Sequence, residues 1–480
     1  MKKHKMWING NWVDALSGQT YPVFNPATEV EIARLPLGGQ ADVDKAVAAA
    51  KKAFPAWSKK TVTERSQIMA RIAVAIKENA QELAMLEQID HGFPLTLAID
   101  QPLKAASRFE WVAQAVGSLL TGDVVPPGED NELAYVKREP VGVCAIITPW
   151  NFPLGMITDK LPSILAVGNT CVIKPPSIDS LAALKLAEIL AKLDIPQGVV
   201  NVITGPGGTV GEALTSHRDV NMVAFTGSCE VGKRIMEVGS KTVKRLQLEL
   251  GGKNPVIVMD DADVDLAVSV SVKGQTMNSG QICGSPGRYY VHENIYDEFV
   301  KKFVDGMKKV VTGDPADEKT RMGPVVSAEH RASIERFIKL GVDEGAKLVL
   351  GGKRPTKPPL DRGYFVMPTV FTYVKQNMTI AREEIFGPVS CIMEPFSSDD
   401  EVIAKANDNT FGLRSSVYTR DRARALRFAD SLQAGTINVN GTKRGELPWG
   451  GFKESGLGKE RGKWGLYEFS QLKVVTINIE

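Results

Sequence analysis

Cys283 is the residue of this sequence best suited to covalent chemistry, and it lies in the stretch NSGQICGSPGR. A cysteine thiolate is a strong nucleophile and a metal ligand. The small residues Gly280 and Gly284 leave room for a substrate to approach the sulfur. We expect a helix to start near Cys283 and its backbone dipoles to lower the pKa of the thiol. His292 falls in a predicted strand, RYYVHE, so a base serving this cysteine is expected to be a carboxylate.

Other roles for this cysteine have less support. The chain has five cysteines, which are far apart and form no C-x-x-C pair, and its five histidines do not cluster with them. A disulfide framework and a zinc site are therefore not expected. Cys144 and Cys171 lie in the apolar runs GVCAII and TCVIK, where a small buried hydrophobe is the better interpretation.

Two polar residues at predicted strand ends could act together with Cys283. Glu249, in LELGGKNP, precedes two glycines that let the backbone approach a ligand. A carboxylate there can act as a general base, or it can be a solvated charge at a strand end. Asn151, in ITPWNFP, offers an amide that can hold a developing oxyanion or cap the following helix. The residues alone leave both choices open.

Glycine-rich turns and one lysine indicate where a phosphate-bearing cofactor could bind. GPGGTVG (205–211) and GSCEVG (227–232) each place backbone N–H groups at a helix start, where a pyrophosphate can sit. Glycine turns without a ligand are also common, and no strict G-x-G-x-x-G is present. Lys174, in IKPPS, ends a predicted strand and supplies a cation, although by itself it can be a surface lysine before a turn.

The elements that must position these residues form two predicted α/β units. From Val141 to about residue 250, continuous apolar strands alternate with helices, which indicates a parallel sheet covered on both faces. Ligands of such sheets bind at the carboxyl ends of the strands, where TPWN, KPPS, TGSCEVG and ELGGKNP fall. A second α/β stretch, about 251–448, contains Cys283. Asn9-Gly10 predicts a hairpin near the start of the chain. Residues 121–140 are expected to form a turn-rich linker before a short strand. The last residues, QLKVVTINIE, are expected to form a tail strand that needs a sheet edge to pair with.

Composition sets the broad class. The chain has 480 residues, of which 43% are hydrophobic and 24% charged, as in ordinary globular proteins of two or three domains. A net charge of +2 gives no electrostatic reason to bind nucleic acid or acidic membranes. No apolar run approaches the roughly 18 residues of a membrane helix, and no apolar segment follows the basic start, so we expect a cytoplasmic location.

Taken in order, PWNFP, KPPS, FTGSCEVG, LELGGKNP, GQIC, EEIFGPV and GGFKESGLGKE resemble the NAD(P)-dependent aldehyde dehydrogenase superfamily over nearly the whole chain. The resemblance implies an α/β, aldehyde dehydrogenase-like fold. Its parts would be a Rossmann-type cofactor-binding domain (1–120 and 141–250), an α/β catalytic domain (251–450) and a small β oligomerisation element (121–140 and 465–480). It also implies that a homodimer or homotetramer oxidises a small-molecule aldehyde to the acid with NADP or NAD.

The resemblance further implies a role for each matching residue. Cys283 would form a thiohemiacetal and then a thioester, Asn151 would hold the oxyanion with the Cys283 N–H, and Glu249 would activate the hydrolytic water. Lys160 matches a lysine near the active site. The implied cofactor-binding residues are Lys174 at the adenosine ribose, Trp150, Gly227 and Ser228 at the phosphates, Glu384 and Phe386 at the nicotinamide end, and Thr148, Ser177 and Leu250.

Two departures from the family pattern bear on specificity. Ser177 stands where NAD-preferring members often have glutamate, and with Lys174 it can hydrogen-bond a 2′-phosphate, so we expect NADP to be accepted. Asp159 occupies a place where apolar or aromatic residues are common. Lys443 and Arg444 lie where the family closes its substrate entrance, so they can receive a substrate carboxylate or be solvated. The predicted substrate residues are Met156, Asp159, Ile282, Gly284 and Lys443.

Two alternatives use the same scaffold. A CoA-acylating semialdehyde dehydrogenase would use the same cysteine but release the thioester to CoA. Members of that kind tend to lack the carboxylate base, so the presence of Glu249 favours hydrolysis. A catalytically silent structural protein, as some lens crystallins are, would be free to lose Cys283 or Glu249, and both are retained together with Asn151.

Overall fold

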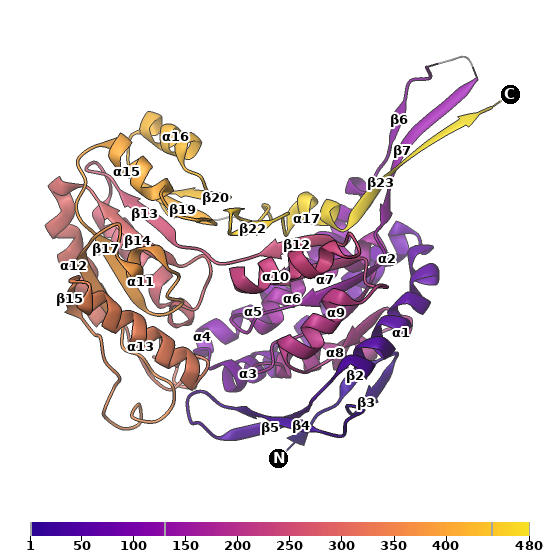
Figure 1. Ribbon diagram of the computed structural model, residues 1–480, viewed down its shortest axis with the longest axis horizontal. Coiled ribbons are helices and arrows are strands. Elements are labelled where there is room, and N and C mark those ends of the chain that lie inside the picture. Colours follow the sequence, from indigo (N-terminus) through magenta and orange to yellow (C-terminus); the bar gives the residue numbers. More distant parts are fainter. Residues whose placement is uncertain (1, 129–130, 443–444, 480) are drawn as a thin grey trace.

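The computed structural model describes residues 2–128, 131–442 and 445–479 of the chain. Two large α/β bodies lie beside each other, and a narrow ribbon of strands projects from one of them (Figure 1). Each body is built on one large sheet with mainly parallel strands. The expected α/β fold class is therefore confirmed. Among the helices of the described ranges, none has the length and apolar character needed to cross a lipid bilayer.

The first large sheet has parallel strands at its centre and antiparallel strands at its edges. Its order is β22 (Gly456–Leu457), β12 (Arg245–Glu249), β11 (Met222–Thr226), β8 (Val143–Ile147), β9 (Thr170–Lys174), β10 (Val200–Val202), β2 (Met6–Ile8) and β3 (Asn11–Val13). The strands from β12 to β10 pair in parallel, with Cys144 of β8 opposite Cys171 of β9. β2 and β3 form the predicted hairpin, with left-handed φ angles of 51° at Asn9 and 75° at Gly10.

Alternate residues of these strands pack against two different sets of helices. Cys144 and Ile146 join a core that includes α2, α5, α7 and α8, whereas Val143 and Ala145 join a core that includes α1, α9 and α10. Burying one such aliphatic side chain contributes about 1.5–3 kcal/mol, so both faces stabilise the sheet. The helices of this body are α1 (Gln40–Ser58), α2 (Val62–Glu78), α3 (Ala80–His91), α4 (Leu95–Ala98), α5 (Asp100–Leu119), α6 (Pro153–Thr158), α7 (Leu161–Val167), α8 (Leu181–Ala191), α9 (Glu212–Ser216) and α10 (Cys229–Ser240).

The second large sheet carries the segment after Cys283. Its order is β15 (Lys347–Leu350), β16 (Thr369–Val374), β17 (Val389–Met393), β14 (Pro286–Val291), β13 (Asn254–Val258), β19 (Arg414–Tyr418) and β20 (Thr436–Val439). The predicted strand RYYVHE is β14, which ends just before His292. The helices here are α11 (Val264–Thr276), α12 (Tyr296–Lys308), α13 (Ala328–Asp343), α14 (Thr379–Arg382), α15 (Asp399–Asn407) and α16 (Arg422–Ser431).

The projecting ribbon in Figure 1 consists of β6 (Asp123–Val125), β7 (Glu132–Pro140) and β23 (Ser470–Asn478). β23 follows α17 (Gly462–Glu468) and pairs antiparallel with β7 along its whole length. The sheet edge that the tail strand needs is therefore supplied by β7 of the same chain. The predicted linker also contains a strand, β6, which was not expected. Smaller sheets pair β1 (Lys2–Lys3), β5 (Glu31–Pro36) and β4 (Thr20–Phe24), and β18 (Phe411–Gly412) with β21 (Phe452–Lys453). The division of the chain into three domains remains a prediction.

Candidate active site

The carboxyl ends of neighbouring strands bring the predicted residues to one edge of the first sheet. β9 ends at Lys174, β11 at Thr226 and β12 at Glu249, and β8 ends shortly before Asn151. Because β9, β8, β11 and β12 pair in parallel in that order, their carboxyl ends lie next to one another. This edge is where sheets of this type bind ligands.

Cys283 lies in a turn between the short 3₁₀ helix η2 (Met277–Gly280) and strand β14, and not at a helix start. Burial raises the pKa of its thiol to about 12, and the nearby carboxyl groups of Glu384 and Glu249 act in the same direction. The expectation of a lowered pKa is therefore wrong. The helix dipole on which it rested is not at this position, and the surrounding protein removes water from the sulfur.

Glu249 is a buried carboxyl group and not a solvated charge at a strand end. Its side chain is 2% exposed, and its Oε1 accepts a long hydrogen bond of 3.5 Å from Gln247 Nε2. Its Oε2 has no hydrogen-bond partner within the described ranges. Burial, supported by the like charge of Glu460, holds the pKa of Glu249 well above its usual value. A carboxyl group in this state can exchange a proton nearer neutral pH, as a general base must.

Lys160 forms a buried ion pair with Glu460 next to this carboxyl group. Its Nζ also donates to Thr226 Oγ1 at 2.6 Å, so the ammonium is held from two sides. The charge of Lys160 opposes the rise in the pKa of Glu249, whereas the charge of Glu460 contributes to it. Sequence reasoning missed Glu460, although it is the last residue of the quoted motif GGFKESGLGKE.

The side chain of Asn151 points toward the loop that carries Cys283. Its Nδ2 donates to the backbone carbonyl of Gln281 at 3.1 Å. The next helix, α6, has Phe152 as its N-cap, so the alternative that Asn151 caps this helix is wrong. An amide nitrogen has two N–H groups, so the second can serve a substrate oxygen beside Cys283.

Lys174 and Ser177 lie at the end of β9, where a cofactor ribose is expected. Lys174 is buried, which excludes the surface-lysine alternative, and its Nζ donates to the Pro175 carbonyl at 2.7 Å. Burial lowers the pKa of Lys174 to about 8. Ser177 Oγ donates to the carbonyl of Gly205 at 3.0 Å, which ties it to the first glycine turn.

The second glycine turn lies at the start of α10. Ser228 is the N-cap of this helix and accepts a hydrogen bond from the Val231 N–H at 3.3 Å, while the N–H of Gly227 donates to the Glu249 carbonyl. Thr148 Oγ1 is buried and has no hydrogen-bond partner in the part of the chain that the structure describes. An orphaned hydroxyl and a buried ammonium at one edge fit a ligand with ribose hydroxyls and phosphates.

Glu384 and Phe386 lie near this edge although they belong to the second body. Glu384 Oε1 accepts from the Gly252 N–H at 2.9 Å, and burial raises the pKa of Glu384 to about 7. The ring of Phe386 stands edge-on to Trp150, with ring centres 5.3 Å apart. Leu250 is buried and its N–H donates to the Ser455 carbonyl at 2.9 Å.

Residues 12–475 match the model of the aldehyde dehydrogenase family. The chain belongs to the aldehyde dehydrogenase family. It is 42% identical over 486 residues to aldehyde dehydrogenase, cytosolic 1, of Rattus norvegicus, which covers 99% of this chain and 95% of the relative.

Two crystal structures show the same family fold. An NADP-dependent enzyme of E. coli is 38% identical and has a TM-score of 0.96, over 99% of this chain and 98% of that one. Betaine aldehyde dehydrogenase of Staphylococcus aureus, in complex with NAD+, is 36% identical with a TM-score of 0.96, over 99% of this chain and 95% of that one. The predicted family, the reaction class of aldehyde oxidation and the use of a nicotinamide cofactor are thus confirmed.

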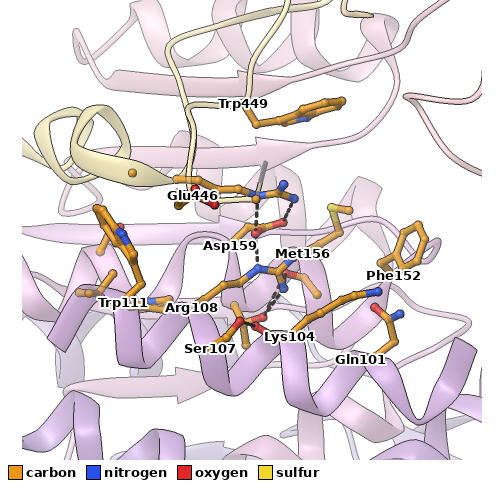
Figure 2. A pocket seen from close by; sticks show the side chains of 18 of the residues that line it. Gln101, Lys104, Ser107, Arg108, Trp111, Phe152, Met156, Asp159, Glu446 and Trp449 are labelled. Atoms are coloured by element: carbon orange, nitrogen blue, oxygen red, sulfur yellow. Dashed lines mark hydrogen bonds and ion pairs between the residues drawn. The ribbon is translucent and has the colours of Figure 1, made fainter. Parts of the chain in front are cut away.

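In this member of the aldehyde dehydrogenase family, a cavity of about 600 Å³ has Cys283 in its wall. Trp111, Phe152 and Trp449 supply aromatic walls (Figure 2). Three of the predicted substrate residues, Met156, Asp159 and Ile282, line it. Gly284 lines a smaller adjoining hollow, where a Cβ atom would lie 3.1 Å from the Trp449 ring. Lys443 and Arg444 lie outside the described residues.

The cavity also holds two arginines that sequence reasoning missed. Arg108 Nε donates to Asp159 Oδ1 at 2.6 Å, an ion pair visible in Figure 2. Arg461 donates to both oxygens of Asp159 at 2.8 Å through Nε and Nη2. Burial alone would raise the pKa of Asp159, but the charges of the two arginines hold this pKa below its usual value. In the sequence, the unusual Asp159 was the one signal for these ion pairs, because no local pattern indicates that Asp159 contacts arginines so far away along the chain.

Proposed function

We propose that Cys283 is the nucleophile of an aldehyde oxidation that ends in the free carboxylic acid. The observation that carries this proposal is that three functional groups lie near one another, with Cys283 in the cavity wall. They are the Cys283 thiol, the Asn151 amide that reaches the adjacent loop, and the buried carboxyl group of Glu249. A nucleophile, an oxyanion donor and a base are what acyl transfer through a thioester requires.

The first covalent step forms a carbon–sulfur bond and removes the thiol proton. Because the raised pKa keeps Cys283 protonated in the free protein, a base has to act during the attack. Glu249, whose own pKa is raised, takes this proton. The aldehyde oxygen becomes an oxyanion, held by the free N–H of the Asn151 amide and by the Cys283 N–H.

The second half of the reaction converts this adduct into the acid. Bound NAD(P)+ supplies the acceptor for the hydride that the carbon loses. The resulting thioester is attacked by water while Glu249, having released its first proton to solvent, takes a proton from that water. The carbon–sulfur bond breaks, and the leaving Cys283 thiolate takes the proton that Glu249 removed from the water.

We propose that both NAD and NADP fit the cofactor edge. Lys174 and Ser177 would hold the adenosine ribose or its 2′-phosphate, and Gly227 and Ser228 the pyrophosphate. A phosphate would favour the charged form of the Lys174 ammonium, whose pKa burial lowers to about 8. Glu384 would hold the nicotinamide ribose. The relatives support both choices, since one is called NADP-dependent and the other contains NAD+.

We propose that the preferred aldehydes carry an anionic group at the end away from the carbonyl. Arg108 and Arg461 both pair with Asp159, and Glu446 also lines the cavity. Their side chains remain 23% and 26% exposed, and both line the cavity. A partly desolvated guanidinium gains from an anion that it can hydrogen-bond. Charge-assisted hydrogen bonds of this kind contribute about 1.5–3 kcal/mol.

A substrate panel tests this function. Nicotinamide reduction would be followed with NAD and NADP, using succinic semialdehyde and neutral aldehydes of similar length. Cys283→Ala should abolish every signal. Arg461→Gln should lower kcat/KM for the semialdehyde by about 10- to 100-fold and leave neutral aldehydes nearly unchanged. Lys104→Gln, at the exposed rim, is the matched control.

The outcomes of this panel separate the proposals. Equal losses for charged and neutral aldehydes in Arg461→Gln would contradict the anionic preference while leaving the oxidation in place. A signal that requires added CoA would favour the acylating alternative over hydrolysis by Glu249.

We also propose that the chain assembles with a second copy of itself through the β6–β7–β23 ribbon. Val474 lies opposite Val136 on one face, and Ile477 lies opposite Leu133 on the other, so each face carries an apolar pair among charged neighbours. Val474 is 69% exposed, as expected of a sheet that another subunit would cover. A homodimer is the smallest such assembly. The cytosolic name of the rat relative supports a cytoplasmic location.

A further inference from the structure

His91 connects the end of helix α3 with the loop that carries Cys283. It is the last residue of α3 and is fully buried. Its Nδ1 lies 2.7 Å from Asp179 Oδ2, and its Nε2 lies 2.7 Å from Asn278 Oδ1. The three residues come from distant segments, so only the folded chain joins them.

Asn278 in turn contacts Asn151, the proposed oxyanion residue. Its Nδ2 donates to the backbone carbonyl of Asn151 at 2.7 Å and to that of Gln281 at 3.2 Å. The Asn151 amide donates to the same Gln281 carbonyl at 3.1 Å. Asn278 therefore holds both the main chain of Asn151 and the carbonyl group on which the Asn151 side chain rests.

The backbone at Asn278 needs an anchor of this kind. Asn278 and the next residue, Ser279, both have left-handed conformations, with φ angles of 50° and 54°. Such conformations of non-glycine residues cost about 1–3 kcal/mol each and persist where the surrounding contacts fix them. The side chain of Ser279 donates to the Gly323 carbonyl at 2.8 Å, and that of Asn278 is held by His91. The strained segment just before Cys283 thus depends on side-chain contacts.

The hydrogen bonds determine where the protons of this network lie. Since Asn278 Nδ2 donates to two carbonyls, its Oδ1 faces His91 and can only accept, so His91 Nε2 carries a proton. Burial lowers the pKa of His91 to about 4 and raises the pKa of Asp179 well above its usual value. His91 is therefore neutral, and its Nδ1 accepts the proton of Asp179. The donors run in one direction, from Asp179 through His91 to Asn278.

We infer that His91 is a positioning residue for the oxyanion site, which fixes the Asn151 amide relative to the Cys283 sulfur by holding Asn278. His91 is not among the described residues that line the cavity, so it acts through Asn278 and not on the substrate. This inference rests on the proposed roles of Cys283 and Asn151. Loss of an orienting contact of this type lowers activity about 10- to 100-fold.

Variants of His91 and Asp179 test the contact. His91→Phe keeps a ring next to Phe93 but removes both hydrogen bonds. We expect it to lower kcat about 10- to 100-fold, with the cofactor KM and the alkylation rate of Cys283 unchanged. His91→Gln keeps an N–H that can reach Asn278 and should recover most of the activity.

Asp179→Asn creates no cavity and tests the proton assignment. Its amide can still donate to His91 Nδ1, so activity should stay near that of the parent protein, whereas Asp179→Leu should resemble His91→Phe. A loss of activity in Asp179→Asn as large as in Asp179→Leu would overturn the neutral network.

A double-variant cycle decides whether His91 acts through Asn151. His91→Phe combined with Asn151→Ala should lose no more activity than Asn151→Ala alone, because the group being positioned is already absent. The inference about His91 would be overturned if the double variant lost the product of the two single losses in kcat. It would also be overturned if His91→Phe left kcat unchanged while Asn151→Ala reduced it. In both cases the proposed roles of Cys283 and Asn151 would stand. If Asn151→Ala itself has no effect, the proposed oxyanion role fails and the inference fails with it.

Discussion

Replacing Glu249 by glutamine should slow the chemistry without weakening the fold. Glutamine has nearly the same shape, so it fits the buried site at the end of β12. It cannot accept a proton, and general bases contribute about 10²- to 10⁴-fold to the steps they assist. We therefore expect kcat at neutral pH to fall by a factor in this range.

The pH profile of the reaction adds a second signature. In the parent protein, the rate should rise with pH as the raised pKa of Glu249 is passed and then level off. In Glu249→Gln, the thiolate of Cys283 forms only by direct ionisation, and burial still raises the pKa of this thiol although the contribution of the Glu249 charge is gone. The rate of the first turnover should then rise about tenfold per pH unit throughout the alkaline range, without a plateau.

The stability of the variant should change in the opposite direction to its activity. A carboxyl group with a raised pKa in the folded state adds stability at low pH, which is lost as the pH rises through that folded pKa. Glu249 therefore makes the folded protein less stable in alkaline solution, and Glu249→Gln should unfold at the same temperature or higher there.

Stopped-flow measurement of nicotinamide reduction gives the first-turnover and steady-state rates, and thermal unfolding at several pH values gives the stability. Glu249→Asp is the matched control, since it keeps a carboxylate at a shorter reach. An unchanged kcat and an unchanged plateau in Glu249→Gln would refute the assignment of Glu249 as the base.

Three further predictions concern cofactor choice, the ion pair and assembly. Ser177→Glu should lower kcat/KM for NADP at least about tenfold and affect NAD much less, because a carboxylate repels the 2′-phosphate; equal effects on both cofactors would contradict the placement of Ser177. Lys160→Met leaves Glu460 buried without its partner and should cost about 3–5 kcal/mol of unfolding free energy, measured by denaturant titration. Adding Glu460→Gln should recover part of that loss, and no recovery would count against the pair. Val474→Glu should shift the sedimentation coefficient toward that of a monomer, whereas the exposed Gln471→Glu should not.

The sequence by itself determined the strands and the positions of the polar residues at their ends. Short apolar runs that alternate with helical patterns indicate strands buried on both faces, and Lys174 and Glu249 are the last residues of two of the strands. Parallel pairing then places these ends at one edge, whatever the packing of the helices. The motif order also identified the family, and the small residues around Cys283 made it the candidate nucleophile.

Only the tertiary structure decided what surrounds these residues. The pKa of Cys283 rises because segments distant in the sequence bury it and bring two carboxyl groups close, which no local pattern encodes. Asp159 meets Arg108 and Arg461 across long sequence separations, and His91 meets Asp179 and Asn278 in the same way. Local sequence fixes backbone propensity and hydrophobic period, whereas desolvation and charge pairing depend on all the segments that pack around a group.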